Sequence, residues 1–253
     1  MNLILIHLRK NLLSILSYPK SALTEIVFMF VNDLAFFAVW YILIERFGGI
    51  NGWGLDEATL LLGAFATVFG VSMFFFGGYW EFRKIVRGDF DIYLLRPRSA
   101  LLQYLTDHSD LSVFGDLIFG LFLLSISGYT LFEKLFVVSI GFAVYLSFMI
   151  FLSGLALFVN AMNEDIFLEI TDVVISGSIW PSHTITAEFL RFALVFAIPA
   201  LLVAVLPIEF LMGADNISLI LGGTLLHLVL AFVFWKEGLK RYSGLAGFGW
   251  VRE

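Results

Sequence analysis

The sequence predicts an all-α, polytopic membrane protein in which a single domain, residues 1–253, crosses the bilayer six times. Three observations predict this fold class: 60% of the residues are apolar, only 14% are charged, and the mean hydropathy is +0.95. Soluble domains contain about 25% charged residues. The apolar residues also form long runs, and a helix of about 20 such residues spans the hydrocarbon core of a bilayer.

Six apolar windows are the candidate spans. They cover residues 21–43, 58–80, 111–129, 135–159, 166–180 and 217–235. The first window is too long for the apolar region of a cleaved signal sequence, so we expect it to remain in the membrane. The fifth window is the shortest.

The basic residues indicate how these spans are oriented, because lysine and arginine concentrate on the cytoplasmic side. Of the 15 basic residues, 12 lie before the first span, between the second and third spans, or after the sixth span. The other three, Arg46, Lys134 and Arg191, lie in segments that contain more acids. Both termini are therefore expected in the cytoplasm.

A further apolar stretch, residues 187–212, contains Pro199 and Pro207 together with Arg191 and Glu209. If it crossed the membrane, the basic C-terminal residues would lie outside. Pro199 removes a backbone donor in the middle of the stretch, where a helix should bend or break. We therefore expect a re-entrant hairpin that enters from the outer face and returns to it.

Residues 1–20 alternate apolar and polar positions with helical spacing. This pattern predicts an amphipathic helix that lies on the cytoplasmic membrane surface. Two roles stay open for it: a plain N-terminal anchor, or a part of the machinery that relays force.

The longest and most charged cytoplasmic connection is residues 81–105. Gly88 allows a turn, Asp89 can cap a following helix, and Arg96 precedes a proline, which disfavours further helix. A short helix should therefore project from the membrane and dock into a groove on another protein. Its apolar face consists of Phe90, Ile92, Leu94 and Leu95. An ordinary positively charged loop is the alternative, which composition alone favours.

Ionisable residues inside the spans are costly, so they are candidates for function. Asp33 lies deep in the first span, and Glu169 and Asp172 share a face of the fifth by their i, i+3 spacing. This pair either lines a translocation path or caps a neighbouring helix. Glu25 and Asp116 lie near the inner boundary, and we interpret them as structural.

Aromatic residues are unusually frequent in the second span and include Phe65 and Phe69. Such rings either grip an apolar substrate or face lipid and neighbouring helices. Phe65 and Phe69 are therefore candidates for the substrate path.

Several other chemistries are not expected. The chain has no cysteine, and its four histidines share no ligand spacing, so we predict no metal site. A net charge of −6 and the lack of a long basic cluster argue against a nucleic-acid partner. No lysine follows a glycine, so the phosphate-binding loop of ATPases is absent from the sequence. No catalytic residues are predicted.

Two short motifs carry a family resemblance. The run RGDFDIYLLRPRSALLQYL, residues 87–105, resembles the cytoplasmic loop of the ATP-binding-cassette permeases of the type-2, exporter-like superfamily. Its pattern Gly-x-x-Asp-x-x-Leu-x-Arg-Pro is that of a six-span bacterial subfamily. The ending GLKRYSGLAG, residues 238–247, is similar to that subfamily's Gly-Leu-Arg-Arg-Tyr ending, with Lys240 in place of the first arginine.

The resemblance implies that residues 81–100 form a coupling helix that contacts separate ABC ATPase subunits, which would hold the ATP and Mg²⁺. The implied coupling residues are Arg87, Gly88, Asp89, Asp91, Leu94, Arg96, Pro97 and Arg98. It also implies that the hairpin with Arg191, Pro199 and Pro207 shields the outer end of the path. A second permease, a copy or a sister, would complete the transporter in the lipid of a bacterial inner membrane.

The expected function is therefore the export of an unidentified amphipathic or hydrophobic substrate. A proton- or ion-coupled secondary transporter that uses Asp33, Glu169 and Asp172 is the alternative. Such carriers often contain an internal repeat, and the two halves of this sequence show none. A membrane enzyme built around Asp107 and His108 would need a second set of convergent polar groups, which the loops do not offer.

Overall fold

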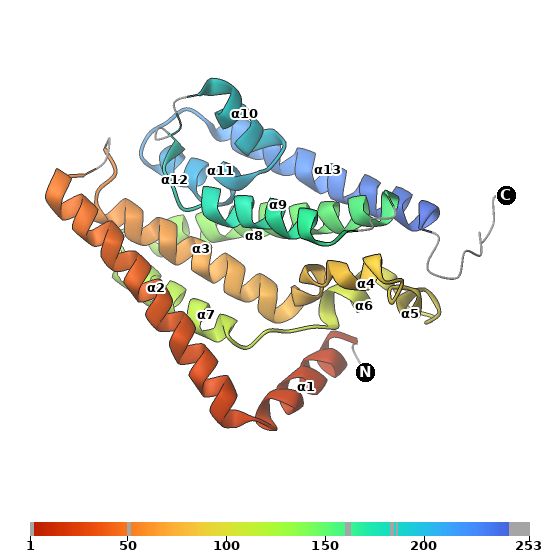
Figure 1. Ribbon diagram of the computed structural model, residues 1–253. Helices are drawn as coiled ribbons and strands as arrows, with labels where there is room; N and C mark the ends of the chain where they lie inside the picture. The colour runs from red at the N-terminus through yellow and green to blue at the C-terminus, as the bar shows by residue number, and fades with distance from the viewer. Residues whose placement is uncertain (1–2, 50–51, 160–162, 183–184, 186, 243–253) are drawn as a thin grey trace.

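The structure is a computed structural model that describes residues 3–49, 52–159, 163–182, 185 and 187–242. All regular elements in these ranges are helical (Figure 1). The helices are α1 (Leu3–Leu16), α2 (Pro19–Phe47), α3 (Leu55–Phe76), η1 (Gly77–Trp80), α4 (Phe82–Val86), α5 (Asp91–Leu94), α6 (Ala100–Thr106), α7 (Val113–Ile126), α8 (Leu131–Phe158), α9 (Asp165–Gly177), α10 (Glu188–Phe196), α11 (Ala200–Val203), α12 (Val205–Leu211) and α13 (Ile217–Arg241).

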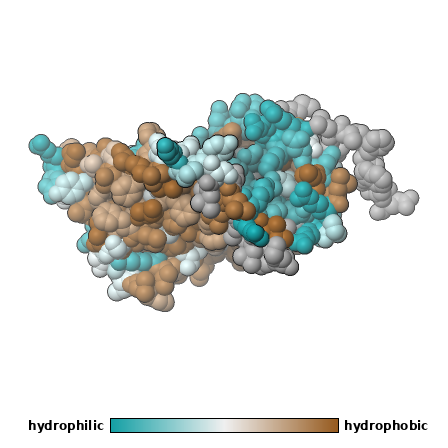
Figure 2. Space-filling view, turned by 90° about the horizontal axis from the view of Figure 1, so that it is seen from below, coloured by the Kyte–Doolittle hydropathy of each residue, from teal (hydrophilic) through white to brown (hydrophobic). Residues whose placement is uncertain are grey.

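Four helices of the described chain, α2, α3, α8 and α13, are long and apolar enough to cross a membrane. The helical path of α3 continues through η1 into α4. Figure 2 shows a broad hydrophobic surface over one part of the molecule and a hydrophilic surface at the end that holds α1 and α4–α6. This division, with the helices themselves, confirms an all-α polytopic membrane protein.

The third and fifth predicted spans are shorter than their apolar windows. Helix α7 has 14 residues and α9 has 13. At 1.5 Å per residue each rises only about 20 Å, against about 30 Å for the hydrocarbon core. The reason is local: residues 107–112 form no helix before α7, and Pro181 follows the end of α9.

Two helix pairs, α8 with α13 and α3 with α7, make the most extensive contacts in the core. Small residues permit the close approach of the helices in both pairs. A Cβ atom added to Gly154 of α8 would lie 2.5 Å from the Trp235 backbone nitrogen of α13. One added to Gly120 of α7 would lie 2.6 Å from Thr67 Oγ1 of α3. These glycines therefore set the spacing of the bundle.

The stretch 187–212 forms α10, a break, and then α11 and α12, and Pro199 is the N-cap of α11. Near the break, Val195 O lies 3.2 Å from Nε2 of the buried His227, and Ser178 Oγ donates to Ala200 O at 2.9 Å. His227 is ten residues into α13, about 15 Å along its axis. Figure 1 shows α10 and α12 at the end of the bundle opposite α4–α6. The helix–break–helix arrangement is as predicted.

Candidate functional site

Helices α4, α5 and α6 form a small lobe at the same end of the molecule as α1 and the end of α13 (Figure 1). The chain turns sharply between α4 and α5. Gly88 has a φ of +79°, a conformation that favours glycine, and Phe90 N donates to Lys84 O at 3.0 Å. The predicted turn at Gly88 is therefore confirmed.

The interior of this lobe is an aromatic cluster around Phe90, whose side chain is fully buried. Its ring centroid lies 5.5 Å from Tyr93 and Tyr104, 5.9 Å from Trp235 and 5.4 Å from Tyr242. Phe90 thus anchors the connection to the end of α13. Its predicted place on an outward docking face is wrong, because the chain's own aromatic rings cover it.

The two sequence motifs meet in this cluster, at the contact of Phe90 with Tyr242. Burial first, and then the negative charges of Asp91 and Asp89, raise the pKa of Tyr242, so its hydroxyl stays neutral beside these acids. Residues 243–247 of the second motif lie outside the described residues. Asp89 does not cap α5 as predicted: Phe90 holds that position, and no side chain caps the helix.

Asp107 joins the lobe to two other elements. Its Oδ2 atom accepts hydrogen bonds of 2.8 Å from Lys84 Nζ and from the Tyr93 hydroxyl, and its Oδ1 atom lies 3.4 Å from Lys10 Nζ of α1. Burial alone raises the pKa of Asp107, but the Lys84 and Tyr93 hydrogen bonds and the charges of Lys84 and Lys10 outweigh it and hold the pKa at about 2.

Helix α1 packs against the lobe with polar side chains. Asn11 Nδ2 donates to Ser109 Oγ at 2.7 Å, and His7 Nδ1 lies 2.9 Å from Thr106 Oγ1. Asn11 and His7 are buried, whereas Leu12 and Leu13 are exposed. The amphipathic helix therefore turns polar groups to the protein and leaves apolar side chains free for a membrane surface.

The outermost part of the lobe is the segment Leu94–Arg98, which we call the tip. All five side chains are exposed, and that of Leu95 is 84% exposed. The buried Gln103 fixes the base of the tip by donating from Nε2 to Tyr93 O at 3.3 Å and to Arg98 O at 3.1 Å. Helix α5 ends before Arg96 and Pro97, as predicted, so the tip consists of the last residue of α5 and a braced loop. No single helix fills residues 81–100.

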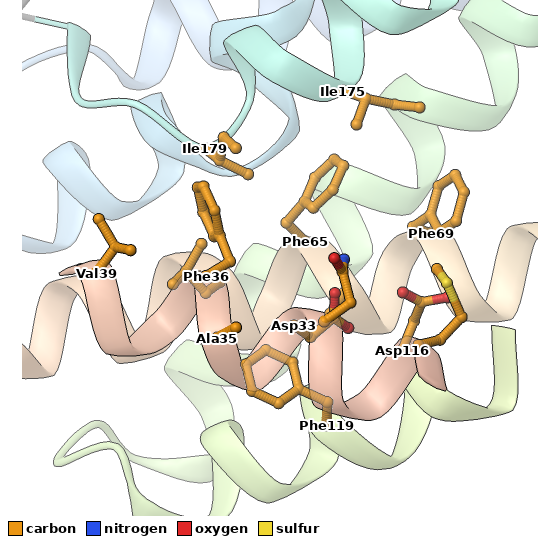
Figure 3. Close-up of a pocket in the computed structure, with 14 residues that line it drawn as sticks. Asp33, Ala35, Phe36, Val39, Phe65, Phe69, Asp116, Phe119, Ile175 and Ile179 are labelled. Carbon is orange, nitrogen blue, oxygen red and sulfur yellow. The ribbon is translucent and has the colours of Figure 1, made fainter. Parts of the chain in front are cut away.

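A second candidate site is a cavity of about 540 Å³ within the bundle. It lies between α2, α3, α7 and α9, and Figure 3 shows the side chains that line it. Three predicted path residues, Asp33, Phe65 and Phe69, line this cavity together. The Phe65 and Phe69 rings stack with centroids 6.2 Å apart.

The cavity also contains Asp116, and Figure 3 shows its carboxyl group and that of Asp33 pointing toward one another. Each carboxyl group is thus a charged neighbour of the other at the wall of the same cavity. Asp116 is 5% exposed. Its place near the inner boundary of the predicted span favours a structural role, and its charge in an apolar helix is the only sequence signal for a place in the cavity.

A comparison with known families shows which kind of protein contains these two candidate sites. A family model described as an ABC-2 family transporter protein matches residues 30–246. This chain belongs to the ABC-2 family. No curated protein and no solved structure matches it. The match confirms the predicted type-2 superfamily and makes the chain a permease component of an ABC transporter, a membrane part that is not itself catalytic.

Two path candidates of this ABC-2 permease lie apart from the cavity. Glu169 and Asp172 are exposed on α9 and do not line it. Asp172 precedes the lining residue Ile175 by three positions, so it lies one turn away on the same face. It also acts electrostatically on Tyr145, whose ring contacts Phe69. Asp172 is therefore nearer to the cavity than Glu169.

The hairpin residues of the ABC-2 permease are linked at the end far from the lobe. Ser182 Oγ donates to Glu209 Oε1 at 2.5 Å and receives a hydrogen bond from Arg191 Nη2 at 3.2 Å. Arg191 of α10 and Glu209 of α12 are thus joined through Ser182. Pro207 is buried within α12. Sequence spacing gave no signal of this bridge, because Ser182 lies outside the apolar stretch.

Proposed function

We propose that this chain is the permease subunit of an ATP-driven ABC exporter that moves an amphipathic or hydrophobic substrate. ATP is bound with Mg²⁺ and hydrolysed in partner ABC ATPase subunits, which contact the permease from the cytoplasm. The observation that carries the proposal is the exposed tip, Leu94–Arg98, held on a braced lobe. Exposed apolar and basic side chains on a fixed support suit a groove on another protein.

The lobe offers a route for force from the tip to the membrane helices. Displacement of the tip acts through the Phe90 cluster on Trp235 of α13. The same displacement acts through Asp107 on Lys84, which follows α3 and η1 in the chain, and on Lys10 of α1. Helix α3 carries Phe65 and Phe69 of the cavity. Movement at the tip is therefore transmitted to the cavity wall.

A second permease, identical or related, completes the transporter in the bacterial inner membrane, with both termini in the cytoplasm. Support comes from the side chains that remain exposed: α2 leaves apolar groups such as Phe28, Val31 and Ile42 uncovered. Lipid or a second permease covers such groups in a membrane. The basic residues around the lobe favour its cytoplasmic placement.

The test uses Arg96→Glu in cells that carry the complete transporter. A reversed charge at the tip is expected to reduce ATPase association and transport at least about tenfold, which is 1.4 kcal/mol of binding free energy. The matched control is Arg46→Glu, because Arg46 is exposed at the other end of the molecule, in the last turn of α2. The control should leave both measurements near wild type.

Unchanged ATPase association and transport in Arg96→Glu would contradict the proposal. Transport that follows a proton gradient in vesicles without any ATPase would favour the ion-coupled alternative. Association is measured as co-purification of the ATPase with the permease, and the loss of transport is checked by ATP hydrolysis of the purified complex in reconstituted vesicles.

A further inference from the structure

The acid pair of the cavity, Asp33 and Asp116, is brought together by a close crossing of two helices. Asp33 lies in the middle of α2, and Asp116 lies in the first turn of α7. A Cβ atom added to the neighbouring Gly115 would lie 2.5 Å from Ile26 O and 2.7 Å from Met29 Cβ of α2. This close approach places two acids from different helices side by side in an apolar setting.

The pair lacks a cationic partner among the described residues that line the cavity, none of which is basic. The buried Oδ2 atoms of Asp33 and Asp116 have no hydrogen-bond donor in the described chain. Asn32 lines the cavity beside Asp33, and Asp110 is the other acid whose charge acts on Asp116. The elements α3 and α9 contribute apolar side chains to the cavity, and no charge.

Two ionised carboxylates that face each other in an apolar cavity repel one another. The pair is therefore expected to share a proton when no cation is bound, because a second buried charge without a partner is costly. A positively charged group that enters can replace this proton, which then passes to water. Charge is conserved in this exchange, and the buried negative charge gains a partner.

The walls of the cavity select the kind of cation. Phe36, Phe65, Phe69 and Phe119 line it, and aromatic faces attract organic cations. The described residues contain no group of three or more acids or histidines that could hold a metal ion. The volume of about 540 Å³ lies in the range of small-molecule sites. An anion would meet only repulsion.

We propose that this cavity binds an amphipathic organic cation, with its charge on the Asp33–Asp116 pair and its apolar body against Phe36, Phe65 and Phe69. The inference rests on the proposed function, because it takes the bound cation to be the class of substrate that the transporter exports. Binding itself needs no ATPase.

The test measures binding of radiolabelled tetraphenylphosphonium to the full-length chain in lipid nanodiscs, without an ATPase. Binding is expected to be saturable, to strengthen from pH 6 to pH 8, and to release protons. Asp33→Asn and Asp116→Asn should each weaken it about tenfold or more, and neutral triphenylphosphine oxide should show none of these dependences. The control is Glu25→Gln, because Glu25 is exposed on α2 and bonds to Ser21 outside the cavity.

Equal tetraphenylphosphonium binding by wild type and both Asn variants, or identical behaviour of the neutral compound, would overturn the inference. If an Asn variant does not fold, Phe69→Leu replaces it. This variant should weaken binding of the cation more than that of the neutral compound, because the ring contacts the apolar body of both and attracts only the charged one; equal weakening of both would also overturn the inference. The two proposals can be told apart. Loss of cation binding with intact ATPase coupling would contradict only the proposed substrate class. Intact cation binding without ATPase coupling would contradict only the proposed ATP-driven exporter.

Discussion

At the scale of single residues, Asp107 shows how one carboxylate can join three elements. It lies just after α6 and accepts hydrogen bonds from Lys84 and Tyr93 while it faces Lys10 of α1. Its side chain is 23% exposed, so water screens these interactions only in part. Removal of its charge leaves two lysines without their shared partner.

We therefore expect Asp107→Asn to lower the stability of the lobe by about 1.5–3 kcal/mol, the range for hydrogen bonds to charged groups. The measurement is the thermal unfolding midpoint in detergent, with Glu237→Gln as control. The Glu237–Lys240 ion pair is also close, at 2.6 Å, but it is exposed at the end of α13, so its loss should change the midpoint little.

The pH dependence of this contribution has a defined sign. The pKa of Asp107 is lowered to about 2 in the folded protein, so its contribution is complete above the ordinary aspartate pKa and is lost as the pH falls through about 2. The difference between Asp107→Asn and wild type should thus be constant from pH 5 to pH 8. A midpoint equal to that of wild type, or a difference that grows over this range, would contradict the assigned role.

Single residues also show where sequence rules suffice. The end of α5 before Arg96 and Pro97, and the turn at Gly88, follow from backbone rules that depend only on neighbouring residues. The burial of Phe90 does not, because it depends on Trp235 and Tyr242, which are more than 140 positions away in the sequence. The apolar face predicted for a short helix therefore does not show whether the rest of the chain or another protein covers that face.

At the scale of elements, helix lengths were harder to predict than helix positions. The apolar windows locate α2, α3, α7, α8, α9 and α13, but α7 and α9 are about two thirds of the expected length. Apolar side chains continue beyond both helices, so hydropathy alone cannot mark their ends. The break between α10 and α11 could be predicted because Pro199 interrupts an apolar stretch. That this stretch enters and leaves the membrane on one side stays a prediction.

The hairpin is testable by labelling, and the absence of cysteine from the chain makes single substitutions clean reporters. Glu188→Cys and Asp215→Cys lie on exposed positions before and after the hairpin. If the chain enters and returns, both should react in intact cells with a maleimide that cannot cross membranes. Ala200→Cys should stay unreactive, because Ala200 is buried.

Lys240→Cys serves as the matched reporter of the other side, since Lys240 is exposed at the end of α13. It should react only after the membrane is permeabilised. Reaction of Glu188→Cys and Asp215→Cys from opposite sides would show that residues 187–212 cross the membrane. In that case the orientation of α13 and of the lobe would need to be reassigned.

At the scale of the whole molecule, two sites lie at different depths and are joined by continuous helices. The tip stands on a lobe that contacts α1 and α3 through α6, and Trp235 of α13 through Phe90 and Tyr104. Helix α3 passes from the lobe to the cavity. The family and the all-α fold were predictable because composition and two motifs are properties of the linear sequence. The Asp33–Asp116 pair was not, because helix packing, which one sequence does not specify, brings the two acids together.

The most direct test of the account replaces Leu95 by the photo-crosslinking residue benzoylphenylalanine in cells that carry the complete transporter. Phe132 is the matched control position, because it is 80% exposed, close to the 84% of Leu95, but lies at the start of α8 at the opposite end of the bundle. We expect the probe at Leu95 to form an adduct with an ABC ATPase subunit and the probe at Phe132 to form none. An ATPase adduct from Phe132, or labelling of the tip from outside the cell, would contradict the central claim that the tip docks on a cytoplasmic ATPase.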